Sequence, residues 1–214
     1  MKTAKKAMLM TLCAIILVVA TVFGTMAYLT STDEVVNTFT VGNVAIKLDE
    51  AKVGTDGKAL TGADATRVKE NSYKLLPGHT YNKDPMVTVL NGSEASYIKM
   101  TVTFSKADAL DAIFAPDGAN LTSTFKGYDT VNWIAKGNTK DANANTRTYE
   151  FWYKEAVGAP NGDFALDALF DSITVPGTIT KDQLASIEGM TITINAYAIQ
   201  ADGFQDAAEA WNKY

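Results

Sequence analysis

The sequence contains a single cysteine, Cys13, which lies in an apolar stretch near the N-terminus. The rest of the chain therefore has neither a free thiol nor a disulfide, and we expect it to depend on its hydrophobic core alone. The same absence excludes a cysteine protease and any metal site built from thiolates.

Histidine is equally scarce, because His79 is the only one in the chain. A helical zinc-protease motif needs two histidines four residues apart with a glutamate between them. A Ser-His-Asp triad would have to use His79, and no G-x-S-x-G element accompanies it. His79 lies in a proline-glycine turn, so we interpret it as an ordinary polar residue. The sequence predicts no catalytic residue, no metal ligand and no cofactor.

One loop has part of the pattern of a calcium site. Asp141, Asn143 and Asn145 have the spacing of the first ligands of a calcium-binding loop. The sixth position of such a loop is glycine and the twelfth is glutamate, whereas this chain has Thr146 and Trp152 there. We therefore interpret the segment as a polar loop between strands.

Positive charge is in deficit, with 19 lysines and arginines against 24 aspartates and glutamates. Three of the lysines and none of the acids precede Tyr28, so the chain from Tyr28 onward has 16 basic side chains and a net charge of −8. Such a surface repels nucleic acid and anionic lipid. We expect no nucleic-acid partner.

The N-terminal segment, residues 1–27, has the pattern of a secretory signal peptide. Three lysines precede an apolar run without a charge, which extends from Ala7 to Phe23. Small residues then occupy the −3 and −1 positions of a cleavage site, Thr25 and Ala27, so that Tyr28 becomes the first residue of the mature chain. The alternative is an uncleaved membrane anchor, because a run of this length reaches the short limit for a bilayer core of ~30 Å.

This interpretation divides the chain into a signal peptide over residues 1–27 and one secreted domain over residues 28–214. The mature domain would then be long enough for one hydrophobic core. Only the precursor would contact a membrane. Secreted domains often gain stability from disulfides, and this one has none.

Alternation of apolar and polar residues dominates the mature sequence and predicts β-strands. The segments with this pattern are 44–48, 87–89, 98–105, 129–135, 147–157, 173–175 and 190–198. Asn91-Gly92 is a hairpin turn signal between two of them. About seven to nine sequential strands, with one apolar face each, predict a mainly all-β fold. We expect an antiparallel β-sandwich with short helices in its connecting loops, preceded by a signal-peptide helix.

Other segments depart from this alternation. Residues 49–72 have no sustained period and are interpreted as a long loop. Residues 107–114 have an apolar stripe at helical spacing and predict a short helix, with Ser105 as its cap. Residues 164–170 are interpreted as a helical turn.

Two further helices are expected near the C-terminus. Thr180 and Gln183 have the spacing of a capping box, which predicts a short helix after Thr180. A terminal helix is expected beyond Gly203. Its inner face would consist of Phe204, Ala208 and Trp211.

Aromatic residues cluster in one predicted strand, at Tyr149, Trp152 and Tyr153. Alternating aromatics on a strand more often form core and cross-strand pairs than ligand platforms, so we favour a core role. A monomeric binding module for a glycan or a protein stays open as an alternative. An exposed aromatic patch around Trp133 or Trp152 would support it.

Three blocks of the sequence resemble one bacterial family. The first, "AYLTSTDEVVNTFTVGNVAIKL", joins a small-residue cleavage site, an aromatic residue, an acidic-polar stretch, an N-x-F-x-x-G-like element and a first strand. The second, "LLPGHTYNKDPMVTVLNGSEASYIKMTV", has proline-glycine, lysine-aspartate-proline and a strand-turn-strand. The third is "ITINAYAIQADGFQDAAEAW". In this order the blocks resemble the TasA and camelysin (CalY) family, whose members have a SipW-dependent type of signal peptide.

The resemblance implies a jelly-roll-like β-sandwich, secretion through an ER-type, SipW-like signal peptidase, and a location outside a Gram-positive cell. Studied members of the family form matrix fibres in biofilms. The resemblance therefore implies a structural protein of the extracellular or biofilm matrix that associates with itself or with matrix proteins. Camelysin has been described as a metalloprotease, which leaves a secreted protease as a further alternative, although the chain has no evident metal-ligand set.

A fibre of this kind suggests assembly by strand addition. A sheet edge has unpaired amides and carbonyls, which an extended segment of a neighbouring copy can satisfy. The candidate donor segment runs from Tyr28 to Val41, and the residues in it that we expect to insert are Tyr28, Leu29, Val35, Phe39 and Val41. Alternatively, the same segment folds back as the first strand of its own sandwich.

Overall fold

The computed structural model describes residues 6, 8, 10–15, 42–114 and 125–214. The chain divides into two units, Met1–Val41 and Gly42–Tyr214. In the first unit the described residues are helical and exposed. Within the described part of the chain, we find no helix with the length and apolarity that crossing a membrane requires.

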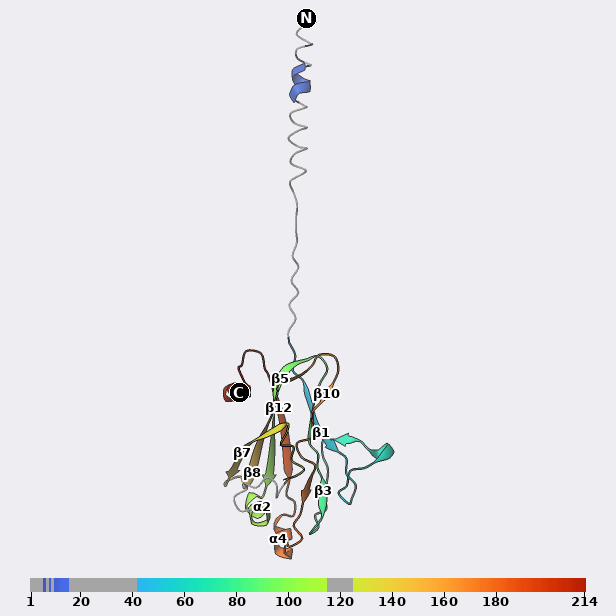
Figure 1. The fold of residues 1–214 in the computed structure, drawn as a ribbon, viewed down its shortest axis with the longest axis vertical. Coiled ribbons are helices and arrows are strands. Elements are labelled where there is room, and N and C mark those ends of the chain that lie inside the picture. Colours follow the sequence, from blue (N-terminus) through green and yellow to red (C-terminus); the bar gives the residue numbers. More distant parts are fainter. Residues whose placement is uncertain (1–5, 7, 9, 16–41, 115–124) are drawn as a thin grey trace. The chain divides into compact units, whose positions relative to one another are not determined.

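The second unit is a β-sandwich of antiparallel sheets joined by short helices (Figure 1), as the alternation predicts. Its described strands are β1 (Ile46–Ala51), β2 (Arg67–Val68), β3 (Thr80–Asn82), β4 (Met86–Val89), β5 (Ser93–Ser105), β6 (Phe125–Lys126), β7 (Trp133–Asp141), β8 (Thr146–Tyr153), β9 (Val157–Ala159), β10 (Phe164–Ala165), β11 (Ser172–Thr174) and β12 (Ile192–Gln200). Its helices are η1 (Gly62–Asp64), α2 (Ala107–Phe114), α4 (Lys181–Ser186) and α5 (Ala207–Lys213).

One layer of the sandwich is a sheet with the order β12-β5-β8-β7, and β9 pairs with the beginning of β5. The other layer contains a sheet with the order β10-β4-β1-β2 and a sheet with the order β3-β11-β6. Figure 1 shows β7, β8, β5 and β12 on one side of the domain and β1, β10 and β3 on the other. The core lies between the two layers.

The core is built mainly from alternate residues of β5 and β8. On β5, the side chains of Ile98, Met100, Val102 and Phe104 are fully buried, while the residues between them are accessible. On β8, Tyr149, Phe151 and Tyr153 are buried in the same core. The predicted core role is therefore confirmed for Tyr149 and Tyr153, whereas Trp152 is half-buried on the other face of β8.

Helix α2 has the predicted bounds, Ala107–Phe114, but its cap is different. The amide of Ala107 donates to the carbonyl of Asn145 at 2.9 Å, and the amide of Asp108 donates to Oδ1 of Asn145 at 2.9 Å. Ser105 cannot serve as the cap because its hydroxyl binds the amide of Thr191 at 2.8 Å. The prediction of Ser105 was wrong because the cap comes from the β7–β8 hairpin, a distant part of the sequence.

Three other predicted segments differ from the structure. Residues 49–72 are not one loop, because β1 continues to Ala51, and η1 and β2 follow. Residues 164–170 are extended instead of helical: β10 pairs with β4, and the amide of Leu166 donates to the carbonyl of Val87 at 2.9 Å. Residues 129–135 begin with a turn, and the strand itself starts at Trp133.

The two C-terminal helices are present. Helix α4 has the predicted capping box, in which Thr180 and Gln183 bind each other's backbone amides. Helix α5 buries Ala210 and Trp211, whereas Ala208, which was predicted to face inward, is exposed. The ammonium of Lys99 on β5 lies 4.5 Å from the Trp211 ring centroid, which ties α5 to the sheet.

Candidate functional site

The residues predicted to carry signal cleavage and strand donation lie outside the described residues. They are Thr25, Ala27, Tyr28, Leu29, Val35, Phe39 and Val41. The described domain can nevertheless be searched for a sheet edge that would accept such a segment.

Strand β12 has an open edge. It pairs with β5 in unbroken register from Ile192 opposite Phe104 to Gln200 opposite Ser96, and in the described part of the chain no strand pairs with its other side. None of its nine residues is charged, and none is proline. Charges, prolines and bulges are the usual means by which proteins protect an edge from pairing, so this edge is unprotected.

The hydrogen bonds of β12 identify the backbone groups that face outward. The amide of Ser105 donates to the carbonyl of Thr191, and the amide of Ala201 donates to the carbonyl of Ala95. Because residues of an antiparallel strand bind alternately to either side, the odd-numbered residues of β12 bind β5. The even-numbered residues therefore present their amides and carbonyls at the open edge. Their side chains include Ile192, Ile194, Ala196 and Ala198, which pack against the core.

The opposite edge of the same sheet is protected. Strand β7 contains Lys136 and Lys140, and its register shifts between Ala135 and Gly137. Gly137 has a φ of 122°, a conformation that favours glycine. A bulge at Lys136, with a second lysine further along the strand, twists this edge away from further pairing. Of the two edges, only that of β12 is suited to accept a strand.

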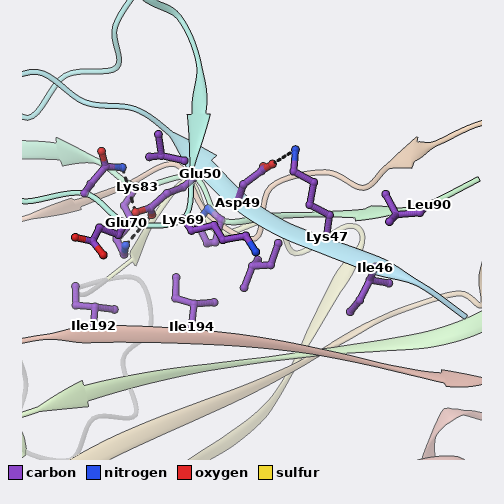
Figure 2. Close-up of a pocket in the computed structure, with 14 residues that line it drawn as sticks. Ile46, Lys47, Asp49, Glu50, Lys69, Glu70, Lys83, Leu90, Ile192 and Ile194 are labelled. Carbon is purple, nitrogen blue, oxygen red and sulfur yellow. Dashed lines mark hydrogen bonds and ion pairs between the residues drawn. The ribbon is translucent and has the colours of Figure 1, made fainter.

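A groove runs between β12 and β1. It is a cavity of about 610 Å³ with Ile192 and Ile194 on one wall and Ile46 and Leu48 on the other. Figure 2 shows Ile192 and Ile194 across the cavity from the strand that carries Ile46, with Lys83 and Glu50 toward one end. A second cavity of about 860 Å³ continues past Ile192 toward α4 and shares several lining residues with the first. An extended chain laid along β12 would therefore find space beside it and apolar side chains beneath it.

Paired charges line the β1 side of the groove. Arg67 on β2 binds the carboxylate of Asp49 and, at 2.9 Å, that of Asp84. Lys83 and Glu50 form a second pair at 2.7 Å, and both side chains are 8% exposed. Removing one member of such a buried pair leaves an uncompensated charge, so these pairs fix the wall of the groove.

Protonation of Asp49 gives a testable pH dependence. Burial acts to raise the pKa of Asp49, but hydrogen bonds from Lys47 and Arg67 outweigh it and hold the pKa below its usual value. A carboxylate with a lowered pKa stabilises the fold above its unfolded pKa of about 3.9, and this stabilisation is lost as the pH falls through the folded pKa. We expect Asp49→Asn to reduce the loss of stability on acidification from about pH 5 downward.

Urea unfolding of the wild type and the variant at neutral and acidic pH would measure this effect. Glu155→Gln serves as the control because Glu155 is exposed. An equal loss of stability on acidification in the wild type and in Asp49→Asn would contradict the expectation.

The other positions that the sequence singled out do not form a ligand site. Asp141 accepts the amides of Asn143 and Ala144, so this segment is the β7–β8 hairpin turn. Trp133 is 1% exposed, and Trp152 is half-buried with Lys136 over its ring. His79 is exposed. No cluster of three or more potential metal-binding side chains (His, Cys, Asp, Glu) occurs among the described residues.

Comparison with known proteins returned no family model, no curated protein and no solved structure that matches this chain. The site therefore has to be interpreted from its own geometry. Alternation in the sequence predicted strand β12 but could not predict that it lies at an edge, because that depends on which strands pair. The absence of charge between Ile192 and Gln200 is the signal that was available.

Proposed function

We propose that this protein is a secreted structural protein of the extracellular or biofilm matrix, and that its copies assemble by strand addition. After removal of the signal peptide by an ER-type, SipW-like peptidase, the segment from Tyr28 to Val41 of one copy would pair with the open edge of β12 in the next. The observation that carries the proposal is the unprotected edge of β12 beside a groove with apolar walls.

The chemistry of donor and acceptor supports this pairing. The donor segment has apolar side chains at odd-numbered positions, Leu29, Val35, Phe39 and Val41, which an extended strand would direct to one face. The groove has the four apolar side chains described above to receive them. A contact between unlike surfaces of successive copies does not close on itself, so it generates filaments.

A single substitution at the open edge tests the proposal. Ala196 presents its amide to the open side of β12, so Ala196→Pro removes one donor without removing a hydrogen bond to β5. We expect this variant to fold as the wild type does and to form no filaments. Ala196→Ser, which keeps the amide, is the matched control and should assemble normally.

Electron microscopy and size-exclusion chromatography of the secreted chain provide the readout, and circular dichroism checks the fold. Deletion of residues 28–37 removes much of the donor and should have the same effect as Ala196→Pro. Filaments of unchanged length in both variants would contradict the proposal.

A monomeric binding module for a glycan or a protein has less support. The patch that would favour it requires exposed rings at Trp133 or Trp152, but Trp133 is buried and the Trp152 ring is covered by Lys136. A secreted metalloprotease would need a ligand set, and we propose no catalytic role for this chain.

A further inference from the structure

Two side chains beside the groove, Lys83 and Asn71, bind the carboxylate of a third, Glu50. Nζ of Lys83 donates to Oε2 of Glu50 at 2.7 Å, and Nδ2 of Asn71 donates to Oε1 of Glu50 at 3.1 Å. Figure 2 shows Lys83 beside Glu50, and a dashed line marks the ion pair between them. A primary amine and a primary amide are thus held by the two oxygens of the same acid.

The amide of Asn71 is fixed in one orientation by its other contacts. Oδ1 accepts the backbone amide of Val53 at 3.0 Å, and Nδ2 donates to the carbonyl of Ala51 at 2.8 Å. A backbone amide can only donate and a carbonyl can only accept, so the oxygen and the nitrogen of Asn71 are assigned without ambiguity. The carbonyl of this amide is polarised by Val53, and its nitrogen points to the acid.

Two of these side chains, Glu50 and Lys83, are buried, and Asn71 is half-buried. Glu50 and Lys83 are 6% and 7% exposed, and the Lys83 ammonium lies 5.7 Å from the centroid of the Tyr73 ring. Burial in the first place, and the negative charge of Glu50 in the second, raise the pKa of the Tyr73 hydroxyl above its usual value. Burying an ion pair costs desolvation free energy. Transfer of a proton from Lys83 to Glu50 removes this cost, because it converts the pair into two neutral groups.

We propose that Lys83 and Asn71 condense into an intramolecular amide bond, with Glu50 as the group that transfers the proton. Nζ of Lys83, after losing a proton to Glu50, attacks Cγ of Asn71, and the amide of Val53 stabilises the charge that develops on Oδ1. Glu50 then passes that proton to Nδ2 and accepts a second proton from Nζ, the bond between Cγ and Nδ2 breaks, ammonia leaves, and Glu50 ends the reaction protonated.

The reaction balances without a further reagent. One C–N bond forms, one C–N bond breaks, and one molecule of ammonia is released, with no change of oxidation state. Holding the two reacting groups on one acid supplies the proximity that such a condensation needs. The product joins the chain after β2 to the chain after β3, in a domain in which the described residues from 42 onward include no cysteine.

Peptide mapping of the secreted full-length chain by mass spectrometry tests this bond. Trypsin should not cut after an acylated Lys83, so we expect Glu70–Lys74 to be joined to Leu75–Lys99 as a branched peptide. The branched peptide should be lighter than the two separate peptides by one ammonia. Recovery of free Glu70–Lys74, together with cleavage after Lys83, would overturn the proposal.

Variants identify the role of each group. Glu50→Gln and Asn71→Ala should each abolish the branched peptide, whereas Lys47→Gln, which removes an exposed cation from the same groove, should retain it. Cyclic imide formation at Asn91-Gly92 would also release ammonia and give the same loss of mass. It would not modify Lys83, however, so trypsin would still cut there, and this cleavage distinguishes the imide from the proposed bond. A branched peptide in Glu50→Gln would overturn the role of Glu50. Because the wild-type map already decides whether the bond exists, the test does not depend on how well the variants fold.

Discussion

Replacing Phe125 by alanine is expected to lower the free energy of unfolding by about 3–5 kcal/mol. Phe125 on β6 is 1% exposed and lies at the centre of an aromatic cluster. Its ring centroid is 4.5 Å from that of Phe170, 5.2 Å from that of Tyr149 and 5.8 Å from that of Phe104. Truncation removes one ring from all of these contacts and leaves a cavity that the surrounding strands cannot fill.

Chemical denaturation monitored by circular dichroism would measure the change for Phe125→Ala. Phe164→Ala is the matched control, because Phe164 is 48% exposed and lies outside the core. We expect the control to stay within about 0.5 kcal/mol of the wild type. A loss below about 1 kcal/mol for Phe125→Ala would show that the cluster contributes less than its burial implies.

The second large effect is expected at Asp111, a buried carboxylate on α2. Arg147 on β8 donates to both of its oxygens, at 2.8 and 2.6 Å, and Lys140 approaches at 3.0 Å. Burial acts to raise the pKa of Asp111, but hydrogen bonds from Arg147 and Lys140 outweigh it and hold the pKa below its usual value. Asp111→Ala should cost about 3–5 kcal/mol, because it leaves the guanidinium buried without its acid.

Two further variants separate this cost from the general effect of changing α2. Asp108→Ala removes an exposed partner of Lys140 on the same helix and should cost less than about 1 kcal/mol. The double replacement Asp111→Leu with Arg147→Met removes both charges and should recover most of the stability. If Asp111→Ala and Asp108→Ala destabilise equally in urea unfolding, the buried pair has no special role.

The elements that could be predicted from the sequence are those with local signals. Alternation of apolar and polar residues predicted β5, β8 and β12, and apolar residues at helical spacing predicted α2. The spacing of Thr180 and Gln183 predicted the cap of α4. In each case the residues that determine the element lie within it or next to it. The antiparallel β-sandwich followed from these strands, because they alternate and succeed one another along the chain.

The predictions that failed concern segments whose conformation depends on contacts with residues distant in the sequence. Leu166, Leu169 and Phe170 have helical spacing, but each is buried because the extended chain packs against the core beside β4. Asp111 occupies the buried side of α2 because Arg147 binds it, which no pattern within α2 can indicate.

The cluster of Glu50, Asn71 and Lys83 beside the groove was not predicted, for the same reason. Residues 49–72 are polar, yet Glu50 binds both Asn71 and Lys83, which lie well beyond it in the sequence. A polar segment that supplies a buried acid looks, in sequence, like an exposed loop. The pairing of β1 with both β2 and β4 brings these side chains to one place.

In the proposed assembly, the unequal edges of the β12-β5-β8-β7 sheet would limit how many neighbours each copy can bind by strand pairing. The edge strands of the described β10-β4-β1-β2 sheet, β10 and β2, have two residues each, too few to template a long partner. The edge strands of the third described sheet, β3 and β6, have three and two residues. With the β7 edge protected by its bulge and lysines, the described strands of each copy would have a valence of one as an acceptor. Assembly through such a monovalent acceptor would produce unbranched chains, and a free peptide with the donor sequence would act as a chain terminator by occupying the terminal subunit.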